Sequence, residues 1–184
     1  MGEILTFTQA LPPDRSLPPV DYGAFVQQIL EEARPVAALR SATLEVHSPV
    51  PSVQLRMNPK RLRRLWLNLI QNATDAMLQG GKIRLRFEVK PTELVTELED
   101  SGPGIAPGVA NRLFEAFVTH GKAHGTGLGL AICKRIIEDH EGWISARNAP
   151  SGGAVFSFGL PLPKGNAGKS VTDKHSPADA PPLQ

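Results

Sequence analysis

The spacing of apolar residues predicts alternating strands and helices between residues 21 and 163. Along 82–90 the apolar side chains of Ile83, Leu85, Phe87 and Val89 alternate with charged ones, which is typical of a strand with one buried face. Residues 93–99 continue as a second strand. Further strands are expected at 42–47 and 53–57, and a closing hairpin at 143–148 and 154–160.

Helices are expected between these strands. The stretch 58–79 begins with an N-cap residue followed by proline and ends before Gly80 and Gly81. Its apolar residues form one core-facing stripe at helical spacing: Leu62, Leu65, Trp66, Leu69, Ala73, Ala76 and Met77. Other helical patterns cover 21–40, with Pro35 as a candidate break, and 128–140, while 111–117 reads as a short helix or a loop. This order predicts an α/β (α+β) fold, a two-layer sandwich with helices on one face of a mixed β-sheet.

Three short polar side chains lie beside the stripe. Asn68, Asn72 and Asp75 fall at i, i+4 and i+7, so they share one line along the helix. Asparagine is a mediocre helix former, so this line works against folding and points to a function. Mg²⁺ takes oxygen ligands and shares them with substrate phosphates, which suits such a line. The alternative is that these side chains are solvated or cap neighbouring loops.

Two glycine-rich segments complete the candidate chemistry. Residues 100–105 (DSGPGI) follow a predicted strand, and 125–130 (GTGLGL) open a predicted helix. Where Asp100 ends a strand and Gly102 and Gly104 expose the backbone, a flat heterocycle can lie against the chain while the carboxylate accepts from an exocyclic amine. Unpaired N–H groups at the start of the second helix favour phosphate oxygens. Either segment alone also fits an ordinary turn.

Four segments, in this order, resemble the motifs of the GHKL ATP-binding superfamily, which includes gyrases, heat-shock chaperones, mismatch-repair proteins and histidine kinases. Residues 68–77 (NLIQNATDAM) resemble its N box, and 100–105 resemble its G1 box. Residues 113–117 (LFEAF) resemble its F box, and 125–129 its G2 box. The motifs span 58–141, and the strand patterns extend the match to about residue 163.

The resemblance implies an ATP site. In it Asn72 is the Mg²⁺ ligand with Asn68 assisting, Asp100 binds the adenine amino group, and the G2 box closes a lid over the phosphates. Phe114 and Phe117 are ordinary core residues under the lid, anchors of the segment that reorders on ATP binding, or both. The expected ATP-binding residues are Asn68, Asn72, Asp75, Asp100, Gly102, Gly104, Ile105, Phe117, Lys122, Gly125, Thr126, Gly127, Leu128 and Gly129.

Position 68 distinguishes branches of the superfamily. Its ATPases carry a general-base glutamate four residues before the metal-binding asparagine, and this chain has Asn68 there, which cannot take a proton at neutral pH. The domain alone is therefore expected to bind ATP and hydrolyse it poorly. Histidine kinases resemble the chain at this position. Many kinases have lysine or arginine at the position of Asp75, and the aspartate makes this stretch similar to the nitrogen-regulation type of sensor kinase. Because Asp75 cannot neutralise phosphate, Lys122 in the lid is the candidate for that task.

None of the five histidines is a convincing phosphoacceptor, so no catalytic acceptor or general base is expected in the chain. His140 precedes an acidic residue but reads as a helix C-terminus. His47 lies in a predicted strand and His175 in a polar tail. His120 and His124 lie in the short lid, where exposure to solvent and contact with phosphate both remain open.

The remaining segments suggest how the chain is divided. Residues 1–9 resemble the last turns of a sensor-kinase dimerisation helix, and 10–20 read as a proline-rich linker. Residues 21–163 form the expected catalytic domain, and 164–184 are expected to be a disordered tail. The chain thus looks like a kinase cut just upstream of its catalytic domain.

Composition restricts the partners. With 184 residues, 41% of them hydrophobic, the chain is long enough for one full core. A net charge of +2 does not favour nucleic acid or membrane as a partner, and no apolar run approaches the roughly 20 residues of a membrane span. The single Cys133 excludes an internal disulfide and is expected in the core; the cytoplasm is the fitting compartment. The basic run 60–64 reads as a solvated face or a docking surface.

The sequence therefore predicts the ATP-binding catalytic domain of a two-component sensor histidine kinase. Such a domain transfers the γ-phosphate of Mg²⁺-ATP to a histidine on a dimerisation domain that the chain does not contain. Expected partners are ATP, that dimerisation domain and, indirectly, a response regulator; the fragment is expected to be a monomer and its parent a homodimer. The alternatives are a GHKL ATPase, an anti-sigma-type serine kinase and a nucleotide-binding pseudokinase.

Overall fold

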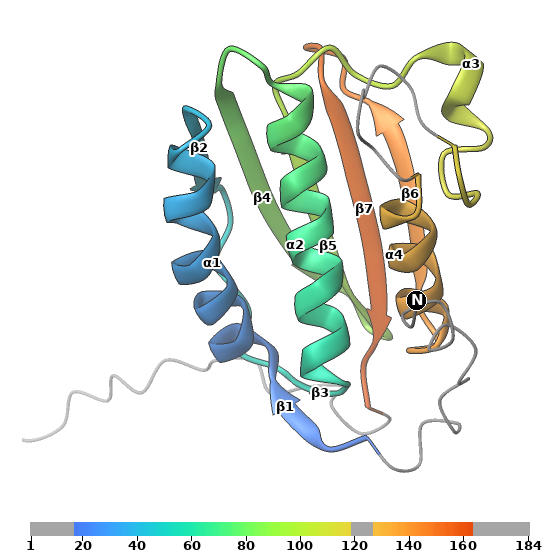
Figure 1. Cartoon of the computed structure of the whole chain (residues 1–184). Coiled ribbons are helices and arrows are strands. Elements are labelled where there is room, and N and C mark those ends of the chain that lie inside the picture. Colours follow the sequence, from blue (N-terminus) through green and yellow to red (C-terminus); the bar gives the residue numbers. More distant parts are fainter. Residues whose placement is uncertain (1–16, 119–126, 164–184) are drawn as a thin grey trace, which may run out of the picture.

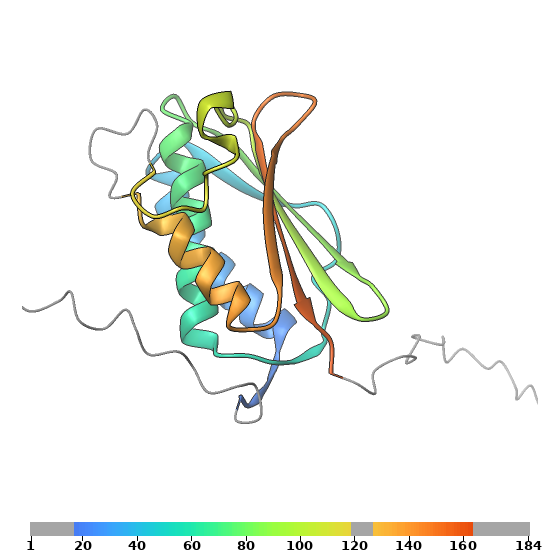
Figure 2. The ribbon, with the colours of Figure 1, turned by 90° about the vertical axis from the view of Figure 1, so that its right-hand side faces the viewer.

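Helices α1, α2 and α4 lie side by side on one face of a five-stranded sheet, as two perpendicular views show (Figures 1 and 2). The computed structural model describes residues 17–118 and 127–163. The expected stub 1–9, most of the expected linker 10–20 and the expected tail 164–184 lie outside these residues. The elements are β1 Pro19–Asp21, α1 Tyr22–Ala38, β2 Ala42–Val46, β3 Gln54–Arg56, α2 Pro59–Ala76, β4 Gly81–Val89, β5 Glu93–Asp100, α3 Pro107–Ala110, α4 Gly129–Glu138, β6 Trp143–Asn148 and β7 Ala154–Pro161.

The sheet has the strand order β2-β4-β5-β7-β6. Strand β2 pairs in parallel with β4, whereas the other neighbours are antiparallel. The predicted mixed sheet with helices on one face is therefore confirmed. A separate antiparallel pair, β1 with β3, was not predicted, because Pro18 and Pro19 suggested only a stiff linker.

Helix α2 occupies the centre of the helical layer, between α1 and α4 (Figure 1). The side chain of Asn58 caps it by accepting from the N–H of Arg61 at 3.1 Å, as the sequence predicted. The apolar stripe is buried except for the half-buried Ala76, and Trp66 packs edge-on against Phe158 with ring centroids 5.9 Å apart. The helix thus fixes the position of its polar line relative to the sheet.

Helix α2 ends at Ala76 and not near Gln79. Met77 leaves the helical conformation, and its carbonyl accepts from Gly80 at 2.9 Å. Gly80 has a φ of +82° and lies against the backbone of Ser41, so the chain turns early to start β4 beside β2. The glycine pair marks the turn into the strand and not the last residue of the helix.

Helix α1 runs without interruption through Pro35, so the candidate break is absent. Asp21 caps its start, accepting from the N–H of Ala24 at 2.8 Å. Ala33 and Ala37, on either side of the proline, are buried against the core, and this packing outweighs the one backbone hydrogen bond that proline removes.

Two further sequence expectations concern Cys133 and the basic run 60–64. Cys133 is fully buried, as expected of a core side chain, and burial raises the pKa of its thiol to about 12. In the basic run 60–64, Arg61 pairs with Asp139 after α4 and Arg63 pairs with Glu32 on α1, so part of its charge binds neighbouring helices.

Within 17–118 and 127–163, no helix combines the length and apolarity that crossing a bilayer requires.

Candidate functional site

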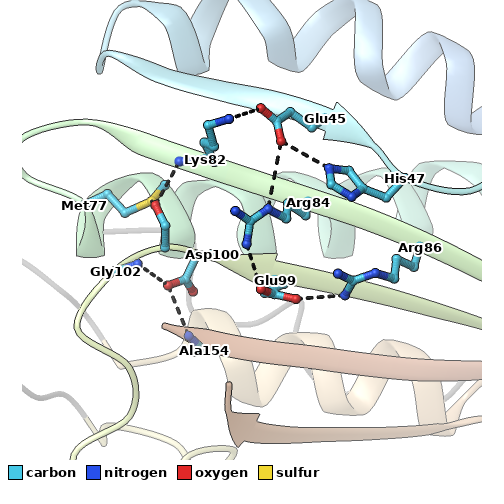
Figure 3. Close-up of polar contacts among 11 residues, drawn as sticks. Glu45, His47, Met77, Lys82, Arg84, Arg86, Glu99, Asp100, Gly102 and Ala154 are labelled. Carbon is cyan, nitrogen blue, oxygen red and sulfur yellow. Dashed lines mark hydrogen bonds and ion pairs between the residues drawn. The ribbon is translucent and has the colours of Figure 1, made fainter. Parts of the chain in front are cut away.

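Asp100 is the last residue of β5 and points to the helical side of the sheet. Only 3% of the residue is exposed. Its Oδ1 accepts from the N–H groups of Gly102 at 2.9 Å and Ala154 at 3.2 Å (Figure 3). Burial raises the pKa of this carboxyl above its usual value, and the two N–H groups oppose that shift only in part. The site therefore holds a partly desolvated acceptor whose second oxygen takes no part in these two bonds.

The glycines after Asp100 are required by close packing. A Cβ on Gly102 would lie 2.9 Å from Oδ1 of Asp100 and 3.4 Å from the side chains of Ala76 and Met77. Gly104 has a φ of +83°, which side chains with a Cβ rarely adopt. The segment 100–105 therefore packs closely against the C-terminal end of α2 and the β6–β7 turn, and neither glycine leaves space for a side chain.

The turn between β6 and β7 also belongs to the site, and sequence reasoning treated it only as a hairpin turn. Gly153, with a φ of +90°, lies so close to the carbonyl of Asp100 that a Cβ would clash with it. The side-chain amide of Asn148 bonds both backbone groups of Ile105. The pair Gly152-Gly153 was a visible signal, but nothing in the sequence linked it to Asp100.

The polar line of α2 runs toward the same end of the sheet. Nδ2 of Asn68 donates to the carbonyl of Gly129 at 3.4 Å, which ties α2 to the start of α4. Asn72 is half-buried one turn further along. Asp75 accepts from Nη1 of Arg40 at 2.9 Å and Nε2 of Gln71 at 2.6 Å. The line is thus not simply solvated, whereas the contact from Asn68 to the Gly129 carbonyl agrees with the alternative that these side chains cap neighbouring segments.

Helix α4 starts at Gly129, and its N-cap residue Leu128 provides no side-chain hydrogen bond to the first turn among the residues that the structure describes. Gly127 precedes it with a φ of +67°, and its carbonyl accepts from the N–H of Phe117 at 2.9 Å. This bond joins the ends of the segment that separates the F box from α4. Gly127, Leu128 and Gly129 therefore lie where the first N–H groups of α4 begin.

The F box is mostly a series of turns after the short helix α3, so the loop reading of 111–117 is the correct one. Phe114 packs against the core, but 77% of Phe117 is exposed and its φ is +67°. The interpretation of Phe117 as an ordinary core residue is therefore wrong. The predicted lid residues His120, Lys122, His124, Gly125 and Thr126 lie outside the described residues.

The two histidines within the described part of the chain have structural surroundings. His140 follows α4 and is 4% exposed. Its Nδ1 lies 2.7 Å from the carbonyl of Ile136, and its Nε2 accepts from the N–H of Asn58 at 2.9 Å. His140 is thus a buried link between α4 and α2, in agreement with its predicted place at a helix end. His47 follows β2 and contacts Glu45 at 3.1 Å.

Comparisons with known proteins show which family the chain resembles. The model of the family described as "Histidine kinase-, DNA gyrase B-, and HSP90-like ATPase" matches residues 57–164. The chain is 33% identical over 178 residues to the sensory histidine kinase/phosphatase NtrB of Rhodobacter capsulatus, covering 88% of this chain and 48% of NtrB. It is 33% identical over 143 residues to the sensor protein KdpD of Clostridium acetobutylicum, covering 74% of this chain and 16% of KdpD. The chain thus spans less than half of either relative.

Solved structures agree with the sequence matches. The catalytic domain of the histidine kinase ThkA superposes with a TM-score of 0.70 at 27% identity, covering 79% of this chain and 97% of that domain. ThkA has also been solved in complex with the response regulator protein TrrA. The family match includes α2, the Asp100 segment and α4, and ATP binding is the property common to it. The chain therefore belongs to the histidine kinase-, DNA gyrase B- and HSP90-like ATPase family.

Proposed function

We propose that this chain is the ATP-binding catalytic domain of a sensor histidine kinase and presents the γ-phosphate of ATP to a histidine on a dimerisation domain. The observation that carries the proposal is the buried carboxylate of Asp100 at the end of β5, on the same side of the sheet as the asparagine line of α2. The similarity to sensor histidine kinases over most of the chain supports this branch of the family.

Adenine is held at the Asp100 end of the site. The carboxylate accepts from the exocyclic amine, and the ring lies beside the segment of Gly102, Gly104 and Ile105, whose path the close packing of both glycines fixes. The raised pKa of Asp100 reflects an acceptor with incomplete solvation, which an amine donor satisfies. Phe117, exposed beside the start of α4, covers the bound nucleotide.

The triphosphate lies toward the start of α4. Gly127, Leu128 and Gly129 offer backbone N–H groups at the positive end of the helix dipole. Gly125, Thr126 and Lys122 complete this lid, with Lys122 neutralising phosphate charge. The ion pair of Asp75 with Arg40, 2.9 Å long, neutralises the carboxylate charge beside the last turn of α2.

The residues on α2 suit Mg²⁺. Asn72 and Asn68 offer neutral amide oxygens on one line, and the bond from Asn68 to Gly129 uses its nitrogen and not its oxygen. Residues 17–118 and 127–163 contain no cluster of three His, Cys, Asp or Glu side chains that could hold a metal alone. This donor set fits an ion that takes most of its ligands from water and phosphate. Mg²⁺ bound there would neutralise charge on the phosphates.

This chain's own contribution to phosphotransfer is positioning and exclusion of water. Asn68 stands where the ATPases of the superfamily have a base, and it cannot activate a water molecule. The site therefore aligns the γ-phosphate and leaves the nucleophile to another domain. The ring of His140 is buried and accepts a hydrogen bond from Asn58, which supports a phosphoacceptor histidine outside the catalytic domain.

The rest of the protein follows from this role. Residues 1–9 are proposed as the end of a dimerisation helix, 10–20 as its connection, 21–163 as the catalytic domain and 164–184 as a tail. The fragment alone is proposed to be a monomer, and the parent kinase a cytoplasmic homodimer. The phosphate on its histidine passes to a response regulator. The ThkA–TrrA complex supports the last step by analogy.

Incubation with labelled ATP tests the proposal. The chain is assayed alone and with the matching dimerisation domain, and the product is tested for the acid lability and alkali stability of phosphohistidine. We expect label only on the added domain, and none when its histidine is replaced by alanine. Steady phosphate release by this chain alone would favour an ATPase, and label on a partner's serine would favour a serine kinase. Nucleotide binding without any transfer would favour a pseudokinase.

A further inference from the structure

Asn148 holds the end of the glycine-rich segment by a two-point contact. Its Oδ1 accepts from the N–H of Ile105 at 2.6 Å, and its Nδ2 donates to the carbonyl of Ile105 at 3.0 Å. One side chain thereby pairs both backbone groups of a residue 43 positions away. Near neutral pH only a carboxamide offers a donor and an acceptor side by side in this geometry.

The same turn holds the other end of the segment. Gly153 lies against the carbonyl of Asp100, and the N–H of Ala154 donates to Oδ1 of Asp100 at 3.2 Å. Between these contacts, a Cβ on Gly104 would lie 2.7 Å from Oδ1 of Asn148. The turn between β6 and β7 therefore holds both ends of the segment from Asp100 to Ile105, while Ser101 between them is bonded to the backbone of Lys82 on β4.

Two backbone hydrogen bonds close the turn itself. The N–H of Ala149 donates to the carbonyl of Gly153 at 2.9 Å, and the N–H of Gly152 donates to that of Ala149 at 3.0 Å. Asn148 and Ala154 are register partners at the end of the β6–β7 ladder, and Ala149 is buried. A displacement of Ile105 would have to break either this turn or the Asn148 amide contacts.

We propose that Asn148 is a positioning residue for recognition of the purine base by Asp100. The inference rests on the proposed function, because it assumes that the carboxylate of Asp100 meets the base. Adenine presents an exocyclic amine to that carboxylate, whereas guanine presents a carbonyl oxygen at the corresponding ring position and is repelled. This discrimination depends on how closely the carboxylate is held, and a looser segment lets the site adapt to either base.

Calorimetric titration of the chain with ATP and with GTP tests the proposal. Asn148→Leu removes both hydrogen bonds at similar size, and should weaken ATP binding about 3- to 10-fold while reducing the ratio of ATP to GTP affinity. Ser151→Ala, in the same turn, is the matched control and should leave both affinities unchanged. A variant that is merely destabilised binds both nucleotides more weakly by the same factor, so it keeps the wild-type ratio of ATP to GTP affinity.

Asn148→Asp adds a test by pH. The ionised carboxylate keeps the acceptor for the Ile105 N–H but places a second negative oxygen against the Ile105 carbonyl; protonation restores a donor there. Its ATP affinity relative to the wild type at the same pH should therefore be low at pH 8 and recover on acidification. If both variants keep the wild-type preference for ATP, the proposal is overturned. A wild-type chain that binds both nucleotides equally also overturns it while ATP binding stands, and one that binds neither removes the proposed function as well.

Discussion

Asp100 is subject to two opposing requirements. Its carboxylate is buried and has a raised pKa, so the ionised form destabilises the folded chain at neutral pH, while adenine recognition depends on that same form. The substitution Asp100→Asn removes the charge and keeps an oxygen for the N–H groups of Gly102 and Ala154. We expect ATP affinity to fall on the order of 10- to 100-fold, because a charge-assisted bond of roughly 1.5–3 kcal/mol is lost. We expect the thermal midpoint without ligand to rise.

Calorimetry and thermal unfolding of one protein preparation separate these two effects. Glu97→Gln is the matched control, since it removes a carboxylate charge from β5 on the opposite face of the sheet. That variant should leave ATP affinity unchanged. An Asp100→Asn chain that binds ATP as well as the wild type would remove the adenine role from this residue.

At the level of elements, the β6–β7 turn offers a comparison between neighbouring glycines. Gly152 and Gly153 have φ values of +88° and +90°, so alanine is strained at both. No described atom lies within 4 Å of a Cβ on Gly152, whereas a Cβ on Gly153 would clash with the carbonyl of Asp100. Gly152→Ala should lower the free energy of unfolding by about 1–2 kcal/mol, the cost of the backbone conformation alone.

Gly153→Ala should cost clearly more than its neighbour, since the turn must also move away from Asp100, and it should weaken ATP binding. Urea unfolding of both variants measures the difference between them. Equal losses would show that the turn yields without disturbing Asp100, which contradicts the close packing in the structure.

The open face of the sheet carries ion pairs that join three strands (Figure 3). Glu99 on β5 accepts from Arg86 at 2.8 Å and Arg84 at 3.0 Å, both on β4, and Arg84 also lies 3.9 Å from Glu45 on β2. The hydrogen bond from Arg86 is the largest cause that holds the pKa of Glu99 below its usual value of 4.5. The ionised form therefore stabilises the fold above pH 4.5, and this contribution is lost as the pH falls through the lowered pKa.

Glu99→Gln should consequently lower the free energy of unfolding at pH 7 by roughly 1–3 kcal/mol and flatten its decline between pH 5 and pH 3. Urea unfolding across that pH range measures both quantities. Because Glu99 faces away from Asp100, ATP affinity at pH 7 should not change. A variant with the same acid sensitivity as the wild type would show that Glu99 does not control it.

For the whole molecule, sequence patterns predicted the features that depend on local periodicity. The alternation along β4, the stripe of α2 and the carboxylate at the end of β5 each follow from side chains near one another in the chain. Contacts between distant segments were not predictable in this way. The Asn148 amide on Ile105, the pairing of β1 with β3 and the buried bridge from His140 to Asn58 depend on the final packing. The break expected at Pro35 was wrong for the same reason, because burial of neighbouring residues in the core outweighs the low helix propensity of proline.

Ligand binding should stabilise the entire domain, because the proposed site joins β5, α2, α4 and the β6–β7 turn. Mg²⁺-ATP at about 100 times its Kd should add roughly 2.7 kcal/mol and raise the thermal midpoint by about 5–10 °C for a domain of this size. Chelation with EDTA should reduce that shift, since the link from the phosphates to Asn72 is lost, and should not affect the smaller shift given by adenosine. In Asn72→Ala the ATP shift should be small with or without EDTA. A wild-type shift that EDTA leaves unchanged would show that the amide line of α2 holds no metal, while Asp100 still anchors the base.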